Sequence, residues 1–192
     1  MRKINFLFAM ILMAMVSQVS FGQAFQQGTK VISVGYGFGN LNKALFNAYE
    51  SNDGYQYKGF GPLFGKFEYG VSDKIGLGLN IAHIGSNMSW NEGSYKSELA
   101  WRNTSALMRL NIHFSKSDKL DAFWGAGLGY RFGKWEYSDN DPSMDNISFS
   151  NVIPLGFETT IGVRYFFIEN LGIYAEAGIA KAPIQFGLSA KF

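Results

Sequence analysis

The stretch "WGAGLGYRFG" (residues 124–133) decides the fold of this protein. Glycine stands at three alternate positions within it, Gly125, Gly127 and Gly129. A dinucleotide-binding loop needs the pattern Gly-x-Gly-x-x-Gly between a strand and a helix. Counting from either of the first two glycines places an aromatic residue in the last position, and no helical pattern follows. A period of two residues is that of a β-strand, so the stretch predicts a strand with one face almost free of side chains.

The same alternation recurs along most of the chain, which predicts an all-β protein. We expect eight strands at about residues 30–39, 59–71, 75–84, 99–114, 120–132, 152–167, 171–180 and 184–192. The only helical pattern is at residues 41–49, where a turn or two of helix fits inside a loop. Long polar connections are predicted at residues 40–57, 85–98 and 133–151, and they alternate with short ones.

The first 22 residues are typical of a secretory signal peptide. Arg2 and Lys3 are followed by an apolar run over residues 4–16, and small residues precede the predicted cleavage after Gly22. The run is too short to span a bilayer as a helix, which takes about 20 residues. We therefore assign residues 23–192 to a single exported domain.

Removing the signal peptide changes the charge of the chain. Of the 17 Lys and Arg residues, Arg2 and Lys3 are lost, which leaves 15 basic residues against 15 acidic ones. A neutral chain does not favour nucleic-acid binding, which usually needs a basic excess. The absence of cysteine excludes thiol catalysis and zinc–thiolate sites.

Each predicted strand has one apolar face and one face rich in glycine and charge. In a soluble barrel the apolar face points inward, whereas in a transmembrane barrel it faces lipid and the polar face lines the lumen. Glycine weakens a strand, but the lumen of an eight-stranded barrel is so narrow that long side chains fit only opposite small ones. We therefore predict an eight-stranded antiparallel transmembrane up-and-down β-barrel.

Charged residues of both signs stand at mid-strand on the glycine-rich face. Isolated buried charges cost several kcal/mol each, so we expect these residues to pair with one another in the lumen. The glycines of residues 125–129 leave room for side chains such as Arg109 and Glu176. The predicted lumen network consists of Lys66, Glu68, Arg109, Glu158, Arg164 and Glu176.

Aromatic residues on the apolar face gather near the strand ends, as in the interfacial girdles of membrane barrels. At the ends with short connections they are Tyr69, Phe114, Tyr165, Phe167 and Phe192. At the opposite ends we expect Tyr36, Phe38, Phe60, Tyr130 and Trp135. An even number of strands places both chain ends on the side of the short connections.

Several segments carry a resemblance to a known family: "GKFEYGVSDKIGLGL" (65–79), "LDAFWGAGLGYR" (120–131), "GVRYFF" (162–167) and the terminal "LSAKF" (188–192). On them the chain resembles the outer-membrane β-barrel domain family, the small OmpA-like, porin-family barrels abundant in Bacteroidetes. The resemblance implies a barrel in the outer membrane of a Gram-negative cell. It also implies that Phe192 is the assembly signal read by the barrel assembly machinery. The family has no shared catalytic residues.

We expect a monomeric structural protein, embedded among outer-membrane lipids and lipopolysaccharide. It would display the loops 40–57, 85–98 and 133–151, through which any extracellular ligand would bind. It is not expected to be an enzyme or to hold a cofactor. The alternatives are a narrow channel gated by exchange of the lumen ion pairs, a lipid-modifying outer-membrane barrel enzyme, and a soluble lipocalin-like barrel. Mid-strand charges on the glycine-rich face disfavour the last.

Two further patterns have weaker support. Asp139, Asp141, Ser143 and Asp145 have the alternate spacing of a calcium loop, but Met144 replaces its glycine and the terminal glutamate is missing, so we expect no metal here.

The two histidines are His83 and His113. His83 lies on the outward face with Ser86 three residues on, but no third catalytic member is evident. His113 is predicted to face inward and to bond a neighbour in the lumen.

Overall fold

The computed structural model describes residues 23–39, 52–150 and 153–192. Two predictions lie outside these ranges, the signal peptide at residues 1–22 and the helical turns at residues 41–49. Within the described ranges every regular element is a strand, and no helix is long and apolar enough to cross a membrane.

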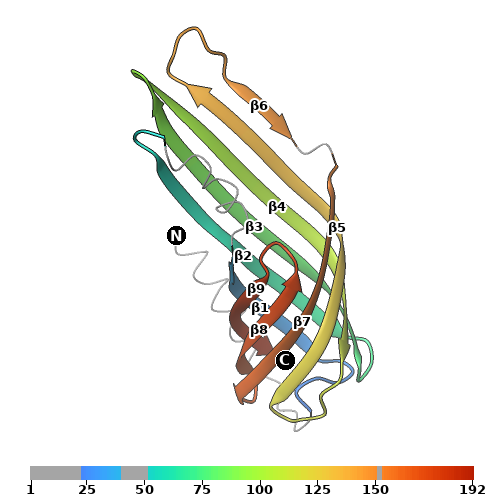
Figure 1. The fold of residues 1–192 in the computed structure, drawn as a ribbon. Coiled ribbons are helices and arrows are strands. Elements are labelled where there is room, and N and C mark those ends of the chain that lie inside the picture. The colour runs from blue at the N-terminus through green and yellow to red at the C-terminus, as the bar shows by residue number, and fades with distance from the viewer. Residues whose placement is uncertain (1–22, 40–51, 151–152) are drawn as a thin grey trace, which may run out of the picture.

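The strands form one closed antiparallel barrel (Figure 1). Eight of them make the wall, each pairing with its neighbour along the chain, while β1 and β9 close the circle. The ninth, β6, pairs only with β5, beyond the region where β7 pairs with that strand. The strands are β1 (Lys30–Phe38), β2 (Gln56–Gly70), β3 (Ile75–Glu92), β4 (Tyr95–His113), β5 (Leu120–Asp139), β6 (Ile147–Ser150), β7 (Leu155–Ile168), β8 (Leu171–Ile179) and β9 (Ile184–Lys191). The predicted fold class, an eight-stranded antiparallel up-and-down barrel, is confirmed.

The polar face of the strands lines the inside of the barrel. Arg109 and Glu176 are 5% and 3% exposed, whereas Met108, next to Arg109, is 76% exposed. Leu128 and Ile161 likewise point outward. This inside-out polarity is the arrangement of a barrel whose outer surface meets lipid rather than water.

The barrel wall is much taller on one side than on the other (Figure 1). Strands β3, β4 and β5 have 18, 19 and 20 residues, whereas β1, β8 and β9 have 9, 9 and 8. The tall part beyond the low rim, residues 55–60, 85–103 and 133–150, is called the extension below.

The extension corrects the prediction of long loops. Most of residues 85–98 belongs to β3 and β4, which meet at a tight turn around Gly93, and β5 runs on to Asp139. The segment 133–151 also contains β6. These segments lack the apolar alternation of the barrel strands, but antiparallel backbone pairing does not need it. Of the third predicted loop, 40–57, residues 40–51 lie outside the described ranges.

The outward face changes from apolar to mostly polar where the barrel passes into the extension. On the outward face of β4, Ile112, Leu110, Met108 and Ala106 are followed by mostly polar residues: Thr104, Arg102, Ala100, Glu98 and Lys96. With Phe114, which is exposed just beyond the strand end, the apolar band runs over residues 106–114. That is close to the 9–11 residues of a transmembrane β-strand.

The inward face of the extension is aromatic instead of charged. Met88 and Trp90 are buried there, with Tyr55, Tyr57, Leu99, Trp135 and Tyr137 packed against them. The placement of Trp135 in the outer aromatic girdle is therefore wrong: it lies on the inward face and its ring is 5.6 Å from that of Trp101. The other four residues predicted with it, Tyr36, Phe38, Phe60 and Tyr130, are exposed on the outward face.

Candidate functional site

A first group of charged side chains fills the middle of the lumen. Lys66 of β2 donates to Glu176 of β8 at 2.6 Å and to Gln185 of β9 at 2.8 Å. Arg109 of β4 donates to Glu176 at 2.8 Å and to Glu158 of β7 at 2.9 Å. Two cations and two carboxylates from four strands form this upper quartet, so its formal charge is zero.

A second group lies below it, toward the short connections. Arg164 of β7 donates to Asp121 of β5 at 2.9 Å and to Glu68 of β2. His113 of β4 lies between the same two carboxylates, with ring nitrogens 2.6 Å from Asp121 and 2.7 Å from Glu68. The imidazolium form satisfies both contacts with its two N–H donors. In that form, this lower quartet is also neutral.

The structure therefore places all six predicted lumen charges inside the barrel, in two separate quartets. Asp121 is a member that the sequence analysis missed, although it shares the inward parity of Gly125 on β5. His113 faces inward as expected, and each of its ring nitrogens lies against a carboxylate. The alternation of inward and outward side chains along β4 and β5 was therefore enough to place His113 and Asp121 inside the lumen.

The glycines of residues 125–129 make room for these side chains. A Cβ atom on Gly125 would contact Asn111 and lie 2.7 Å from Arg109 Nε. One on Gly127 would lie 2.9 Å from Glu158 Cγ, so at this point the neighbour is Glu158 rather than Glu176. Glu176 itself lies against Gly162 of β7.

Both ends of the lumen are closed by residues outside the strands. At the end with short connections, the ring of Phe25 stacks on His113 with centroids 3.4 Å apart. At the other end, the turn between β8 and β9 folds inward, where Ala182 is buried against Phe64 and Ala82. Lys181 of this turn reaches the opposite wall, donating to the carbonyl oxygen of Ala82 at 2.9 Å.

Replacing Lys181 with methionine is expected to loosen this turn. The ammonium also donates to the backbone and side-chain oxygens of Asn103, at 3.0 and 2.7 Å. Hydrogen bonds to charged groups contribute about 1.5–3 kcal/mol, so the free energy of unfolding should fall by about 2 kcal/mol. Amide hydrogen exchange at residues 180–182 should become faster. The control is Lys119→Met in an exposed short connection, and equal exchange in both variants would contradict the role of Lys181.

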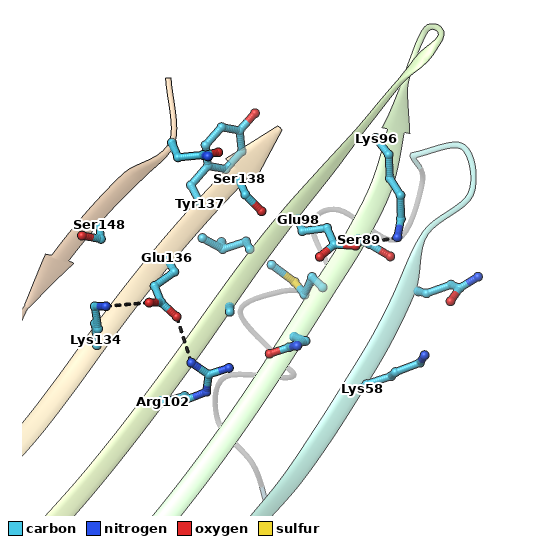
Figure 2. Close-up of a pocket in the computed structure, with 16 residues that line it drawn as sticks. Lys58, Ser89, Lys96, Glu98, Arg102, Lys134, Glu136, Tyr137, Ser138 and Ser148 are labelled. Carbon is cyan, nitrogen blue, oxygen red and sulfur yellow. Dashed lines mark hydrogen bonds and ion pairs between the residues drawn. The ribbon is translucent and has the colours of Figure 1, made fainter. Parts of the chain in front are cut away.

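A groove of about 530 Å³ lies on the outward face of the extension (Figure 2). Arg102 of β4 and Lys134 of β5 both donate to Glu136, at 2.8 and 2.6 Å. Lys96 pairs with Glu98 along β4. The charged residues that line the groove are Lys58, Lys96, Arg102, Lys134, Glu98 and Glu136. Four are basic and two are acidic, so the lining has a formal charge of two positive units.

Local hydrogen bonds lower the pKa of two carboxyl groups of the extension, those of Glu136 and Asp139. The hydrogen bond from Lys134 and its positive charge hold the pKa of Glu136 below its usual range. The Ser97 hydroxyl and the Asp141 backbone amide lower the pKa of Asp139 in the same way. Because a carboxyl with a lowered pKa loses its charge only at lower pH, the ion pairs of Glu136 with Arg102 and Lys134 persist in mildly acidic solution.

The calcium hypothesis finds no support in the geometry of residues 139–145. Asp139 accepts hydrogen bonds from Ser97 and Tyr137, and Asp141 accepts them from Ser143. Across the described part of the chain, no three His, Cys, Asp or Glu residues converge as metal ligands would.

The Ser–His pair considered on β3 is not formed. His83 points outward and lies 2.8 Å from the Thr104 hydroxyl. Ser86 points inward, where its hydroxyl is 2.9 Å from that of Tyr57. The two side chains lie on opposite faces of the strand, so they cannot act together.

Comparisons with known proteins identify the fold. No protein-family model matches the chain, and no curated protein matches it significantly. Among solved structures, Ail, the attachment invasion locus protein of Yersinia pestis, aligns with a TM-score of 0.53 at 14% identity, over 86% of this chain and 99% of that one. The N-terminal β-barrel domain of OprF of Pseudomonas aeruginosa aligns with a TM-score of 0.40 at 15% identity, over 87% of this chain and 98% of that one. The outer membrane protein OprG of the same organism aligns with a TM-score of 0.45 at 12% identity, over 88% of this chain and 97% of that one. The likeness to Ail supports the barrel fold and nothing beyond it.

Proposed function

We propose that this chain is an integral outer-membrane barrel protein that does not conduct ions and that holds its extension on the outside of the cell. Buried ion pairs join strands across the lumen, from β2 to β7 and β8 and from β4 to β8, and this observation carries the proposal. The upper and lower quartets occupy the middle of the lumen, with Arg109 and Arg164 each bonded to two carboxylates. Phe25 and Lys181 close its two ends.

The outer surface supports the placement in a membrane. An exposed band of large apolar side chains surrounds the barrel, including Phe67, Met108, Leu128, Ile161 and Ile173. A band of this kind would be strongly unfavourable in water but suits lipid. Short connections on one side and a tall polar structure on the other match the usual orientation, with short turns in the periplasm and the extension outside.

A role at the cell surface follows from this orientation. The extension contains the polar groove described above, while buried ion pairs cross the lumen between the described strands. The name of Ail, the attachment invasion locus protein, associates attachment with the same fold. We therefore favour a surface scaffold over a channel. The enzyme alternative loses its candidate residues, since His83 and Ser86 lie on opposite faces.

Conductance measurements test the proposal. The protein, inserted in planar lipid bilayers, is expected to give no steady current steps. The double variant Phe25→Ala/Lys181→Ala removes both end contacts but keeps the two quartets, so it should also remain closed. Steady conductance of the unaltered protein would instead establish the narrow-channel alternative.

Fractionation tests the membrane placement independently. The protein should be recovered with the outer membrane and should migrate faster on a gel when unheated than when boiled. Recovery as a soluble periplasmic protein would contradict the proposal.

A further inference from the structure

The groove of the extension continues the lipid-facing surface of the barrel. On β5 the outward side chains Leu128, Tyr130 and Phe132 are followed, at the same parity, by Lys134 and Glu136. The three apolar side chains are 60–62% exposed and belong to the band assigned to lipid. A ligand in the groove would therefore sit directly above the outer leaflet, at the height of its headgroups.

A second hollow joins the groove to the apolar band. It has a volume of about 290 Å³, and Arg102 and Lys134 line both hollows. Phe132 and Pro154 form its apolar part, and Thr104 and Ser150 add hydroxyl groups. Cations and apolar side chains thus meet within one hollow, as a ligand with a charged head and acyl chains would require.

The cations of the groove are available to an anionic ligand. Arg102 and Lys134 share a single carboxylate, Glu136, and their side chains are 58% and 54% exposed. Exposed ion pairs contribute only about 0–1 kcal/mol, so exchanging them for a ligand phosphate costs little. An arginine guanidinium can bind phosphate with two parallel hydrogen bonds, and lysine binds it as a point charge.

We infer that the groove and the hollow below it form a binding site for the phosphorylated sugar headgroup of an outer-leaflet glycolipid. Arg102 and Lys134 bind the phosphate. Glu136 accepts hydrogen bonds from sugar hydroxyls, and Phe132 contacts the acyl chains. This inference rests on the proposed outer-membrane placement and names the lipid that the extension would recognise.

Native mass spectrometry of the detergent-solubilised protein, titrated with bisphosphorylated lipid A, tests the inference. The double variant Arg102→Gln/Lys134→Gln should bind about tenfold or more weakly, because it loses two charge-assisted contacts to phosphate. The control Lys116→Gln/Lys119→Gln removes two exposed lysines at the opposite end of the barrel and should bind like the unaltered protein. Dephosphorylated lipid A should bind the unaltered protein about as weakly as bisphosphorylated lipid A binds the double variant.

Two outcomes would overturn the inference. One is equal lipid A binding by the double variant and the control. The other is equal competition by phosphatidylglycerol, which would show a preference for any anionic lipid instead of a phosphorylated sugar. Either result in a protein that fractionates with the outer membrane leaves the proposed function intact. Recovery of the protein in the periplasm would contradict the proposed function itself.

Discussion

Replacing Arg109 with methionine is expected to lower the free energy of unfolding by about 3–5 kcal/mol, the usual cost of removing one partner from a buried ion pair. The guanidinium donates to Glu158 and Glu176 and also to Asn111 and Thr160 at 2.7 Å each. Without it, the upper quartet holds two carboxylates against the single cation Lys66. Urea unfolding in lipid vesicles, followed by tryptophan fluorescence, measures the change.

Two further variants separate charge imbalance from simple loss of contacts. The double variant Arg109→Met/Glu158→Gln removes one charge of each sign and leaves the pair of Lys66 and Glu176, so it should be more stable than the single variant. Arg102→Met removes an arginine whose ion pair is exposed and should cost less than about 1 kcal/mol. Equal losses for Arg109 and Arg102 would show that the upper quartet does not hold the barrel together.

Replacing Gly125 with leucine is expected to prevent the barrel from folding. The new Cβ would lie 2.7 Å from Arg109 Nε and in contact with Asn111, and the rest of the side chain would need space that the upper quartet already fills. Overpacking by itself typically costs about 1–3 kcal/mol, and here it would also displace the hydrogen bonds of Arg109. The faster-migrating band of the unheated protein should be absent.

Gly65 provides the matched control on β2. It is exposed on the outward face, and a Cβ there would meet no atom within 4 Å. Gly65→Leu should therefore fold and insert like the unaltered protein. If Gly125→Leu also gives a normal folded band, the lumen is wider than these contacts imply.

The alternation of residue types made the barrel predictable. A period of two sends successive side chains to opposite faces, so the parity of Arg109 or Glu176 is known once the strand is recognised. The glycines at residues 125–129 then indicated a crowded interior, because a solvent-facing surface has no need of them. Even Asp121, which is not among the six predicted lumen charges, lies at the inward parity of its strand.

The extension was missed for a physical reason. Residues 85–98 are polar on one face, and the opposite face carries Met88 and Trp90 in place of a regular apolar series. Backbone hydrogen bonds between β3 and β4 hold these residues as strands whatever their side chains. The polar composition of residues 85–98 is therefore typical of a loop. For the same reason, the inward position of Trp135 could not be recognised from a regular apolar series.

The sequence by itself determined the number of wall strands and which side chains of the barrel point inward, because both depend on local periodicity. Short connections between successive strands indicated their antiparallel direction. Only the tertiary structure decided which charges meet. Gly127 faces Glu158 instead of Glu176, and Arg164 pairs with Asp121 and Glu68, because the register of the closed barrel sets the height of each side chain across the lumen. The same holds for Lys181, whose hydrogen bonds to Ala82 and Asn103 join the turn between β8 and β9 to β3 and β4.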